Sequence, residues 1–199
     1  MAYNKEALYQ QNLNIYTEAN PNPNSMKFML SFMLIKEGQS FDFPDKVSAQ
    51  DSPLATALFD YPYVQRVFFM SNFITLTKDD SKSWEEVIPE LKAFIKEYLE
   101  AKKPVFTEEQ TEENPINTED TEAVKMIKGV LDEYIKPAVE MDGGAIQFHS
   151  FDEEKGVLKV LLQGACSGCP SSTLTLKAGI ENLMKRMVPS VTEVIAEGV

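Results

Sequence analysis

Apolar residues in the first half of the chain form short runs that are typical of β-strands. These runs lie at about 14–18, 28–35, 64–70 and 73–77. The run from Phe28 to Ile35 is nearly continuous, which predicts a strand that is buried on both faces. Ser71 and Asn72 alone separate the last two runs, so they predict a tight hairpin. Residues 1–12 are polar and predict a short helix or a frayed end.

Start signals predict two helices in the same half. Ser52 followed by Pro53 is an N-cap with a first-turn proline, and Pro62 prevents this helix from continuing past about Phe59. Ser83 and Glu86 have the spacing of a capping box. Apolar residues then recur at helical spacing, namely Trp84, Val87, Ile88, Leu91, Phe94, Ile95 and Tyr98. Residues 1–102 are therefore predicted to form a small α+β domain with two helices on one face of its sheet.

The pattern breaks at residues 103–119. This stretch contains one lysine against five glutamates, two prolines and few large apolar side chains. Such a composition buries too little apolar surface to fold, and its like charges repel one another. We expect a flexible acidic linker here.

The second half predicts another α+β domain, at residues 120–199. A first helix would place Val124, Ile127, Leu131, Tyr134, Ile135 and Ala138 on one face. Pro137 would kink or restart this helix, and Gly143 and Gly144 would end it. Strands are predicted at 145–151, 156–162 and 191–196, with a helix at 171–187 before the last strand. The predicted fold class is thus two small α+β domains joined by the linker.

The chain holds two cysteines, Cys166 and Cys169, in a loop between a predicted strand and a predicted helix. The first-turn amides of a helix lack intrahelical partners and carry positive partial charge, so thiolates at this junction are stabilised. Gly164 and Gly168 permit tight backbone turns, and Pro170 suits the first helical position. We expect the loop to be exposed at one end of its domain.

Four interpretations of the cysteine pair are open: a structural pair, a thioredoxin-like dithiol, a zinc site and an iron–sulfur site. The dithiol fits poorly, because in that fold most of the sheet follows the motif, whereas little chain follows Cys169. Zinc and iron–sulfur clusters each typically take four ligands, and one chain supplies two cysteines. His149 is the one histidine, and its strand-like surroundings place it on one face of a sheet.

Longer runs around the cysteines resemble a known family. MDGG at 141–144 and GACSGCPSSTLTLKAGIE at 164–181 are similar to the C-terminal domain of NifU-like (Nfu-type) iron–sulfur cluster proteins. NPNPNSMKF at 20–28 resembles the opening of the N-terminal domain that many members carry; without the resemblance it predicts a rigid connector or a partner-recognition surface. One departure is Ala145, where the family commonly has an acidic residue.

The resemblance implies an iron–sulfur cluster carrier rather than an enzyme. Cys166 and Cys169 would be the cluster ligands, and two chains together would bind one cluster, which the family association favours as [4Fe-4S] over [2Fe-2S]. The implied partners are an upstream assembly scaffold, apo-client proteins and a second copy of the chain. A thiol–disulfide redox protein and a zinc-bridged interaction module remain as alternatives for the same cysteines.

Charge and composition narrow the partners and the compartment. The net charge of −12 disfavours nucleic acid and anionic membrane surfaces. No apolar run approaches the roughly 18 residues that span a bilayer, and the N-terminus lacks the pattern of a targeting segment. Two cysteines do not form a secreted-type disulfide framework, and thiols that bind iron need a reducing compartment. The sequence therefore predicts a cytoplasmic protein.

Overall fold

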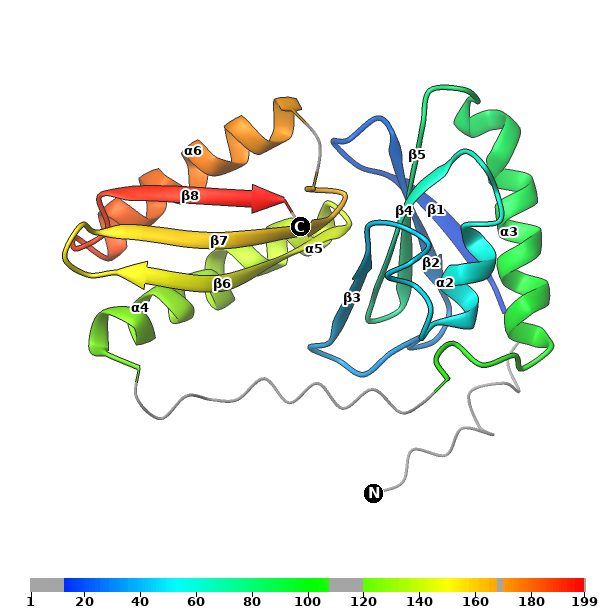
Figure 1. The fold of residues 1–199 in the computed structure, drawn as a ribbon, viewed down its shortest axis with the longest axis horizontal. Helices are drawn as coiled ribbons and strands as arrows, with labels where there is room; N and C mark the ends of the chain where they lie inside the picture. The colour runs from blue at the N-terminus through cyan, green and yellow to red at the C-terminus, as the bar shows by residue number, and fades with distance from the viewer. Residues whose placement is uncertain (1–12, 108–119, 168–169, 199) are drawn as a thin grey trace, which may run out of the picture. The chain divides into compact units, whose positions relative to one another are not determined.

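The structure is a computed structural model that describes residues 13–107, 120–167 and 170–198, with side chains in the first turns of the last helix described from Thr175 onward. Contacts divide the chain into an N-terminal unit, residues 1–19 and 23–112, and a C-terminal unit, residues 20–22 and 113–199. Each unit contains helices and its own sheet (Figure 1), which confirms the predicted α+β class.

The N-terminal unit is built on a five-stranded antiparallel sheet. Its strands are β1 (Ile15–Ala19), β2 (Ser25–Leu30), β3 (Ser40–Phe43), β4 (Val64–Met70) and β5 (Phe73–Lys78). Their order in the sheet is β1-β2-β5-β4-β3. The predicted hairpin is confirmed, since β4 and β5 pair from Met70 and Phe73 outward around Ser71, which has a φ of 47°. The short strand β3 was not predicted.

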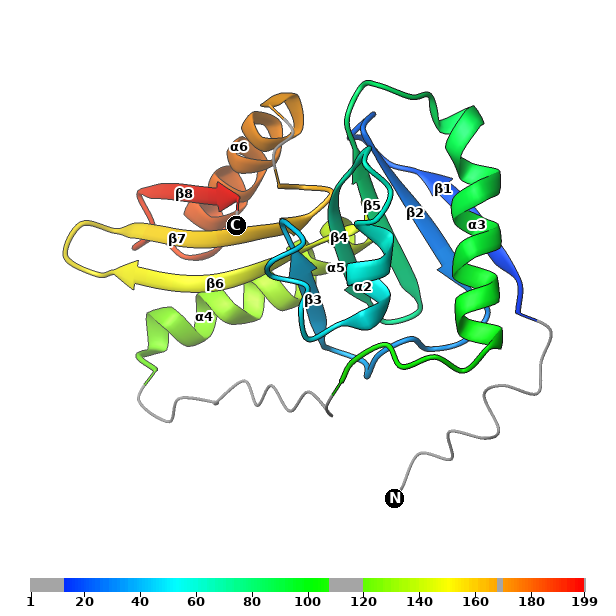
Figure 2. The same ribbon diagram turned by 45° about the vertical axis from the view of Figure 1, so that its right-hand side comes forward.

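Helices α2 (Pro53–Leu58) and α3 (Trp84–Glu100) cover one face of this sheet (Figure 2). Both predicted start signals are confirmed. The Ser52 hydroxyl accepts a hydrogen bond from the backbone N–H of Ala55 (3.2 Å), and Ser83 and Glu86 form a capping box. The largest fully buried side chains of this core are Phe28, Phe69, Leu54, Leu58, Ile74, Leu76, Leu91, Ile95 and Leu99.

The predicted strand at 28–35 is wrong in its second half. β2 is buried on both faces as expected, but it begins at Ser25 and ends at Leu30. The backbone N–H groups of Leu34 and Ile35 instead donate to the carbonyl of Ser71, at 2.8 and 3.1 Å. The apolar run therefore leaves the ladder because the β4–β5 turn takes up its backbone donors.

The first part of the predicted linker packs on the N-terminal core. The ring of Phe106 lies 4.6 Å from that of Phe41, measured between centroids, and Val105 also packs against the cluster. The Tyr98 hydroxyl donates to the carbonyl of Pro104 (2.9 Å). Charge composition did not reveal this attachment, which combines two apolar side chains with hydrogen bonds to the backbone. The remainder of the predicted linker, 108–119, lies outside the described residues, as do residues 1–12.

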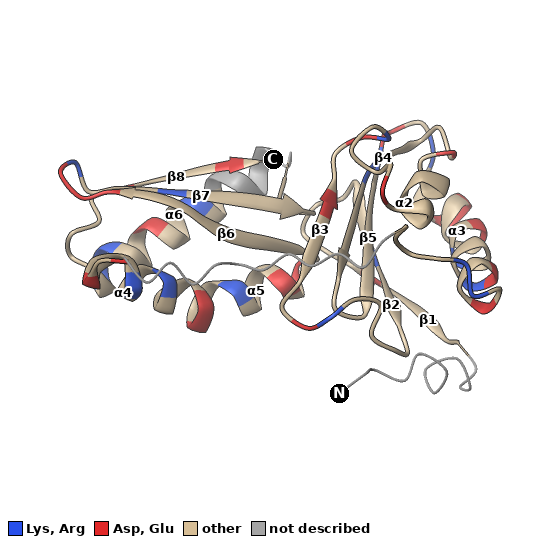
Figure 3. Cartoon of the chain, turned by 60° about the horizontal axis from the view of Figure 1, so that its bottom comes forward, with Lys and Arg blue, Asp and Glu red and all other residues tan. Residues whose placement is uncertain are grey.

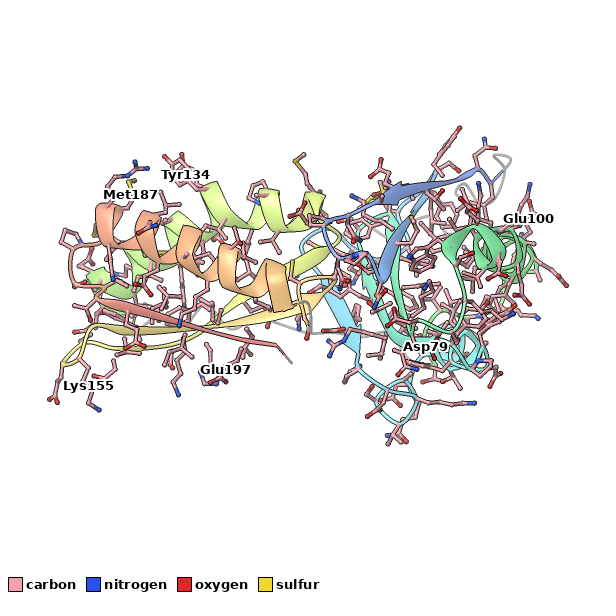
Figure 4. The ribbon with its side chains drawn as sticks, turned by 90° about the horizontal axis from the view of Figure 1, so that it is seen from above. Asp79, Glu100, Tyr134, Lys155, Met187 and Glu197 are labelled. Carbon is pink, nitrogen blue, oxygen red and sulfur yellow. The ribbon has the colours of Figure 1, made fainter. Side chains whose placement is uncertain are left out.

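The C-terminal unit has a three-stranded sheet with helices on one face. β6 (Gly144–Asp152) pairs antiparallel with β7 (Val157–Gly164), which pairs in parallel with β8 (Glu193–Gly198). The helical layer contains α4 (Glu122–Val130), the π-helical turn η1 (Leu131–Ile135), α5 (Lys136–Met141) and α6 (Pro170–Met187) (Figure 4). These bounds agree with the predicted elements to within a few residues, as is usual for helix and strand ends.

The first predicted helix of this unit contains a change of register. Ile127, Leu131 and Ile135 are buried as expected, but Tyr134 and Ala138 are exposed. The π-helical turn at 131–135 has more residues per turn than an α-helix, so it rotates the following residues, and Val139 takes the inward position. The turn immediately precedes Pro137, whose ring cannot fit against an unbroken α-helical turn.

No helix among the described residues combines the length and the apolar character needed to cross a membrane.

Candidate functional site

The cysteine loop joins β7 to α6, as predicted. β7 ends at Gly164 and α6 begins at Pro170, and this helix leads into β8, which lies parallel to β7. The loop therefore sits at the carboxyl end of a strand within a strand–helix–strand crossover. Cys166 is described, whereas Gly168 and Cys169 lie outside the described residues.

Cys166 is buried, which corrects the expectation of an exposed loop for this cysteine. Its residue exposure is 6%, and it is a member of the aliphatic core of the C-terminal unit. Burial is physically inexpensive here, because an uncharged thiol packs like a small apolar group.

Gly144 makes room for the Cys166 side chain. A Cβ atom at Gly144 would lie 2.9 Å from Sγ of Cys166 and 2.5 Å from the carbonyl oxygen of Gln163, both closer than real contacts allow. Gly144 pairs with Gly164 in the β6–β7 ladder, so the missing side chain faces the start of the loop. The sequence analysis assigned Gly144 only to a helix end. Counting back from the turn would have placed it opposite Ala165, because the irregularity between Phe148 and Ser150 shifts the register by one residue.

Backbone hydrogen bonds fix the first half of the loop. Gly164 has a φ of 62°, which favours glycine because a side chain there would be strained. The N–H of Ala165 donates to the carbonyl of Gly143 (3.3 Å), and the N–H of Ser167 donates to the carbonyl of Gly164 (3.1 Å). The bond from Ala165 to Gly143 thus connects the cysteine motif to the MDGG motif, directly beside Cys166.

A cavity of about 380 Å³ borders Cys166. It is lined by Asp142, Ala165, Cys166, Thr175 and Leu176, and by Pro21 and Asn22, which group with the C-terminal unit. The side-chain amide of Asn22 donates to the carbonyl of Ala165 (3.0 Å). Asn22 is a site residue that the sequence analysis treated only as part of a connector or partner surface. Nearby on α5, burial raises the pKa of the Glu140 carboxyl by disfavouring its charged form, and the charge of Lys136 opposes this shift.

The described residues do not supply a complete metal site. Among them, no group of three or more histidine, cysteine or acidic side chains is placed to hold a metal ion. His149 is exposed at an irregularity in the β6–β7 register, with Nδ1 3.1 Å from the Ser150 hydroxyl. It lies on a sheet strand, as predicted, and the structure does not bring it into the described lining of the Cys166 cavity.

Two family descriptions match most of the chain. Residues 15–102 match the N-terminal domain described as "Scaffold protein Nfu/NifU N terminal", and residues 127–195 match the "NifU-like domain". The fold of two α+β units and the cysteine loop at a strand-to-helix junction agree with these matches. The chain belongs to the NifU-like (Nfu-type) protein family.

Individual relatives resemble the chain over most of its length. It is 42% identical to NifU-like protein 4, mitochondrial, of Arabidopsis thaliana, over 92% of this chain and 65% of the relative. It is 41% identical to NifU-like protein 5, mitochondrial, of the same plant, over 92% of this chain and 67% of the relative. It is also 41% identical to the NFU1 iron-sulfur cluster scaffold homolog, mitochondrial, of Drosophila persimilis, over 90% of this chain and 64% of the relative. The chain spans about two thirds of the length of these relatives.

The expectation of a cytoplasmic protein is wrong by comparison with these relatives, all three of which are mitochondrial. The sequence argument rested on the lack of a targeting pattern and on cysteines suited to a reducing compartment. These features do not distinguish one reducing compartment from another.

Proposed function

We propose that this protein is an iron–sulfur cluster carrier, which accepts a cluster from an assembly scaffold and delivers it to apo-client proteins. The observation that carries the proposal is the C-x-x-C loop at the β7–α6 junction of a NifU-like domain. The relative from Drosophila persimilis, named as an iron–sulfur cluster scaffold homolog, supports the same class of cargo. Delivery requires no general acid or base, so we assign no catalytic residue and do not propose an enzyme.

Cys166 and Cys169 are the proposed ligands. Four thiolates complete the usual shell of an iron–sulfur cluster, and one chain supplies two. Two chains would therefore hold one cluster between them, with [4Fe-4S] as the type that the family association favours. The cavity beside Cys166 supports this assignment, because it leaves space next to the buried cysteine without unfolding the loop.

Transfer follows from ligand exchange between thiolates. An incoming client thiolate replaces one cysteine of the carrier on an iron atom, and the displaced cysteine takes up a proton, with no net change in oxidation state. Repeated exchange moves the cluster to the client and separates the two carrier chains. A shell shared by two chains opens more readily than one built within a single core, which suits a cargo that must leave.

The proposed division of labour assigns cargo binding to residues 120–199, with residues 1–102 as a separate domain and 103–119 as a linker. Two hydrophobic clusters without shared members support this division. A tethered N-terminal domain that contacts clients would raise the local concentration of the cluster domain to roughly the millimolar range.

Anaerobic reconstitution with iron and sulfide tests the function. We expect a brown wild-type protein with iron and sulfide in a ratio near one, which is roughly the composition of such clusters. Cys166→Ser and Cys169→Ser should each abolish stable loading while circular dichroism shows an unchanged fold. His149→Ala is the matched control, because it removes the one other strong soft-metal ligand type, and it should load like the wild type.

Three results would contradict the proposal. A colourless protein that binds zinc would favour the zinc-bridged module, and a reversible disulfide without metal uptake would favour the redox protein. A single cysteine variant with a full complement of iron and sulfide would overturn the ligand assignment.

A further inference from the structure

A row of exposed apolar side chains leads from η1 along α5 toward the cysteine loop. Met141 is 77% exposed and Tyr134 is 49% exposed, and Pro137 and Ala138 between them are also exposed. Figure 4 shows Tyr134 projecting from the helical layer on the side away from the strands. The outward positions of a surface helix are usually polar, so this α5 stripe (Tyr134, Pro137, Ala138 and Met141) calls for a physical explanation.

The α5 stripe ends beside the proposed cluster. Met141 is the last residue of α5, and Gly144, whose Cβ position lies against Sγ of Cys166, follows three residues later. Three residues of chain span at most about 10 Å. Anything that brings a further pair of thiolates to Cys166 must therefore approach the exposed end of this stripe.

We propose that the α5 stripe is the protein contact between two copies of this chain in the cluster-bridged dimer. This inference rests on the proposed function, because the second copy is the partner that would supply the other two thiolates of the cluster. The sequence supplies two cysteines per chain and a cluster typically takes four thiolates, so the proposed ligand shell is complete only with a second copy. A single cluster between two identical loops lies on the two-fold axis that relates the copies, which places both Met141 side chains next to that axis.

The stripe is short. Pro137, Ala138 and Met141 lie within about one turn of α5, and Tyr134 precedes them in the π-helical turn η1. A two-fold axis along the helices brings each stripe residue against its own copy. Methionine tolerates such self-contact because its side chain is flexible and polarizable.

The charges beside the stripe permit this approach. Charged residues of both signs lie on α4 and α5 (Figure 3), and Lys136 is neutralised within its own chain by Asp132, at 2.5 Å between Nζ and Oδ1. The stripe is nonetheless small. Four side chains cover far less than the roughly 800 Å² per partner of a typical stable interface. We therefore expect the apo-protein to be monomeric. The dimer should form only when a bound cluster adds iron–thiolate bonds to both chains.

Dilution of the loaded dimer tests the contact in the full-length protein. Wild type and Met141→Glu are loaded anaerobically, iron and sulfide per chain are measured, and dimer dissociation is followed by light scattering. We expect Met141→Glu to raise the apparent dissociation constant about tenfold or more, since burying a charge in an apolar seam is unfavourable. Met126→Glu is the matched control, because Met126 is also exposed, at 49%, but lies outside the stripe on α4, and it should dissociate like the wild type. Met141→Leu should do so as well.

Equal dissociation of wild type and Met141→Glu would overturn the inference. If that variant dimerised normally but delivered its cluster more slowly, the stripe would face the client instead. A loaded wild type that remains monomeric would also overturn it while leaving cargo binding intact. Failure of the proposed function is distinct, since the wild type would then take up no iron and sulfide at all.

Discussion

The cores of the two units differ in what they bury. The N-terminal core includes Phe28, Phe41, Phe43 and Phe69, and its fully buried Ser52 serves as a helix cap. The described buried members of the C-terminal core are aliphatic side chains, a methionine and Cys166. A buried polar or reactive group is thus used for local structure in one unit and is available for chemistry in the other.

This difference shows that exposure is a poor guide to the reactive residue here. Cys166 packs in the core because its neighbour Gly144 has no side chain. The burial of this cysteine therefore depends on the absence of a Cβ atom at residue 144. In the N-terminal unit, large aromatic rings contribute to the core.

Filling the space at Gly144 should produce the largest effect. In Gly144→Ala, the new methyl group would meet the Gln163 carbonyl and the Cys166 sulfur, and the backbone carbonyl cannot swing away because it belongs to the β6–β7 ladder. We expect iron and sulfide content to fall several-fold after reconstitution and stability to fall by about 1–3 kcal/mol, as for other overpacked sites.

Gly129→Ala is the matched control for that substitution. Gly129 lies inside α4, and a Cβ there would meet nothing within 4 Å. This change should leave loading unaltered and raise stability by about 0.4–1 kcal/mol, because it restricts the unfolded chain. Full loading of Gly144→Ala would show that close approach of residue 144 does not position Cys166.

Separating the units should give the next largest effect, on delivery rather than on loading. A fragment of residues 118–199 contains the whole hydrophobic core of the C-terminal unit, so we expect it to fold. It should also bind an iron–sulfur cluster that bridges two copies. Transfer to one apo-client should slow at low client concentration if the N-terminal unit recruits that client. Equal transfer rates throughout would remove this role, and an unloaded fragment would contradict the proposed domain division.

Local signals in the sequence predicted most of the elements, whereas packing decided the features that matter at the site. The caps at Ser52 and Ser83 and the turn at Ser71 act within a few residues, so spacing alone revealed them. The burial of Val139 in place of Ala138 depends on a π-helical turn, which helical periodicity does not encode. The approach of Gly144 to Cys166 joins residues far apart in the chain, and it required the register of two strands.

The smallest predicted effect is confined to the N-terminal unit. Ser83→Ala removes the hydroxyl that accepts a hydrogen bond from the N–H of Glu86, so one first-turn donor of α3 loses its partner. We expect a loss of about 1 kcal/mol in the free energy of unfolding of this unit. Trp84 is the one tryptophan of the chain and lies at the start of α3, so its fluorescence during urea unfolding reports on this unit. Iron and sulfide content should stay at the wild-type value, because the Ser83 cap belongs to a core that shares no member with that of Cys166. A parallel fall in loading would mean that the stability of the N-terminal unit is coupled to the cysteine loop, and the two cores would then have to be treated as one cooperative system.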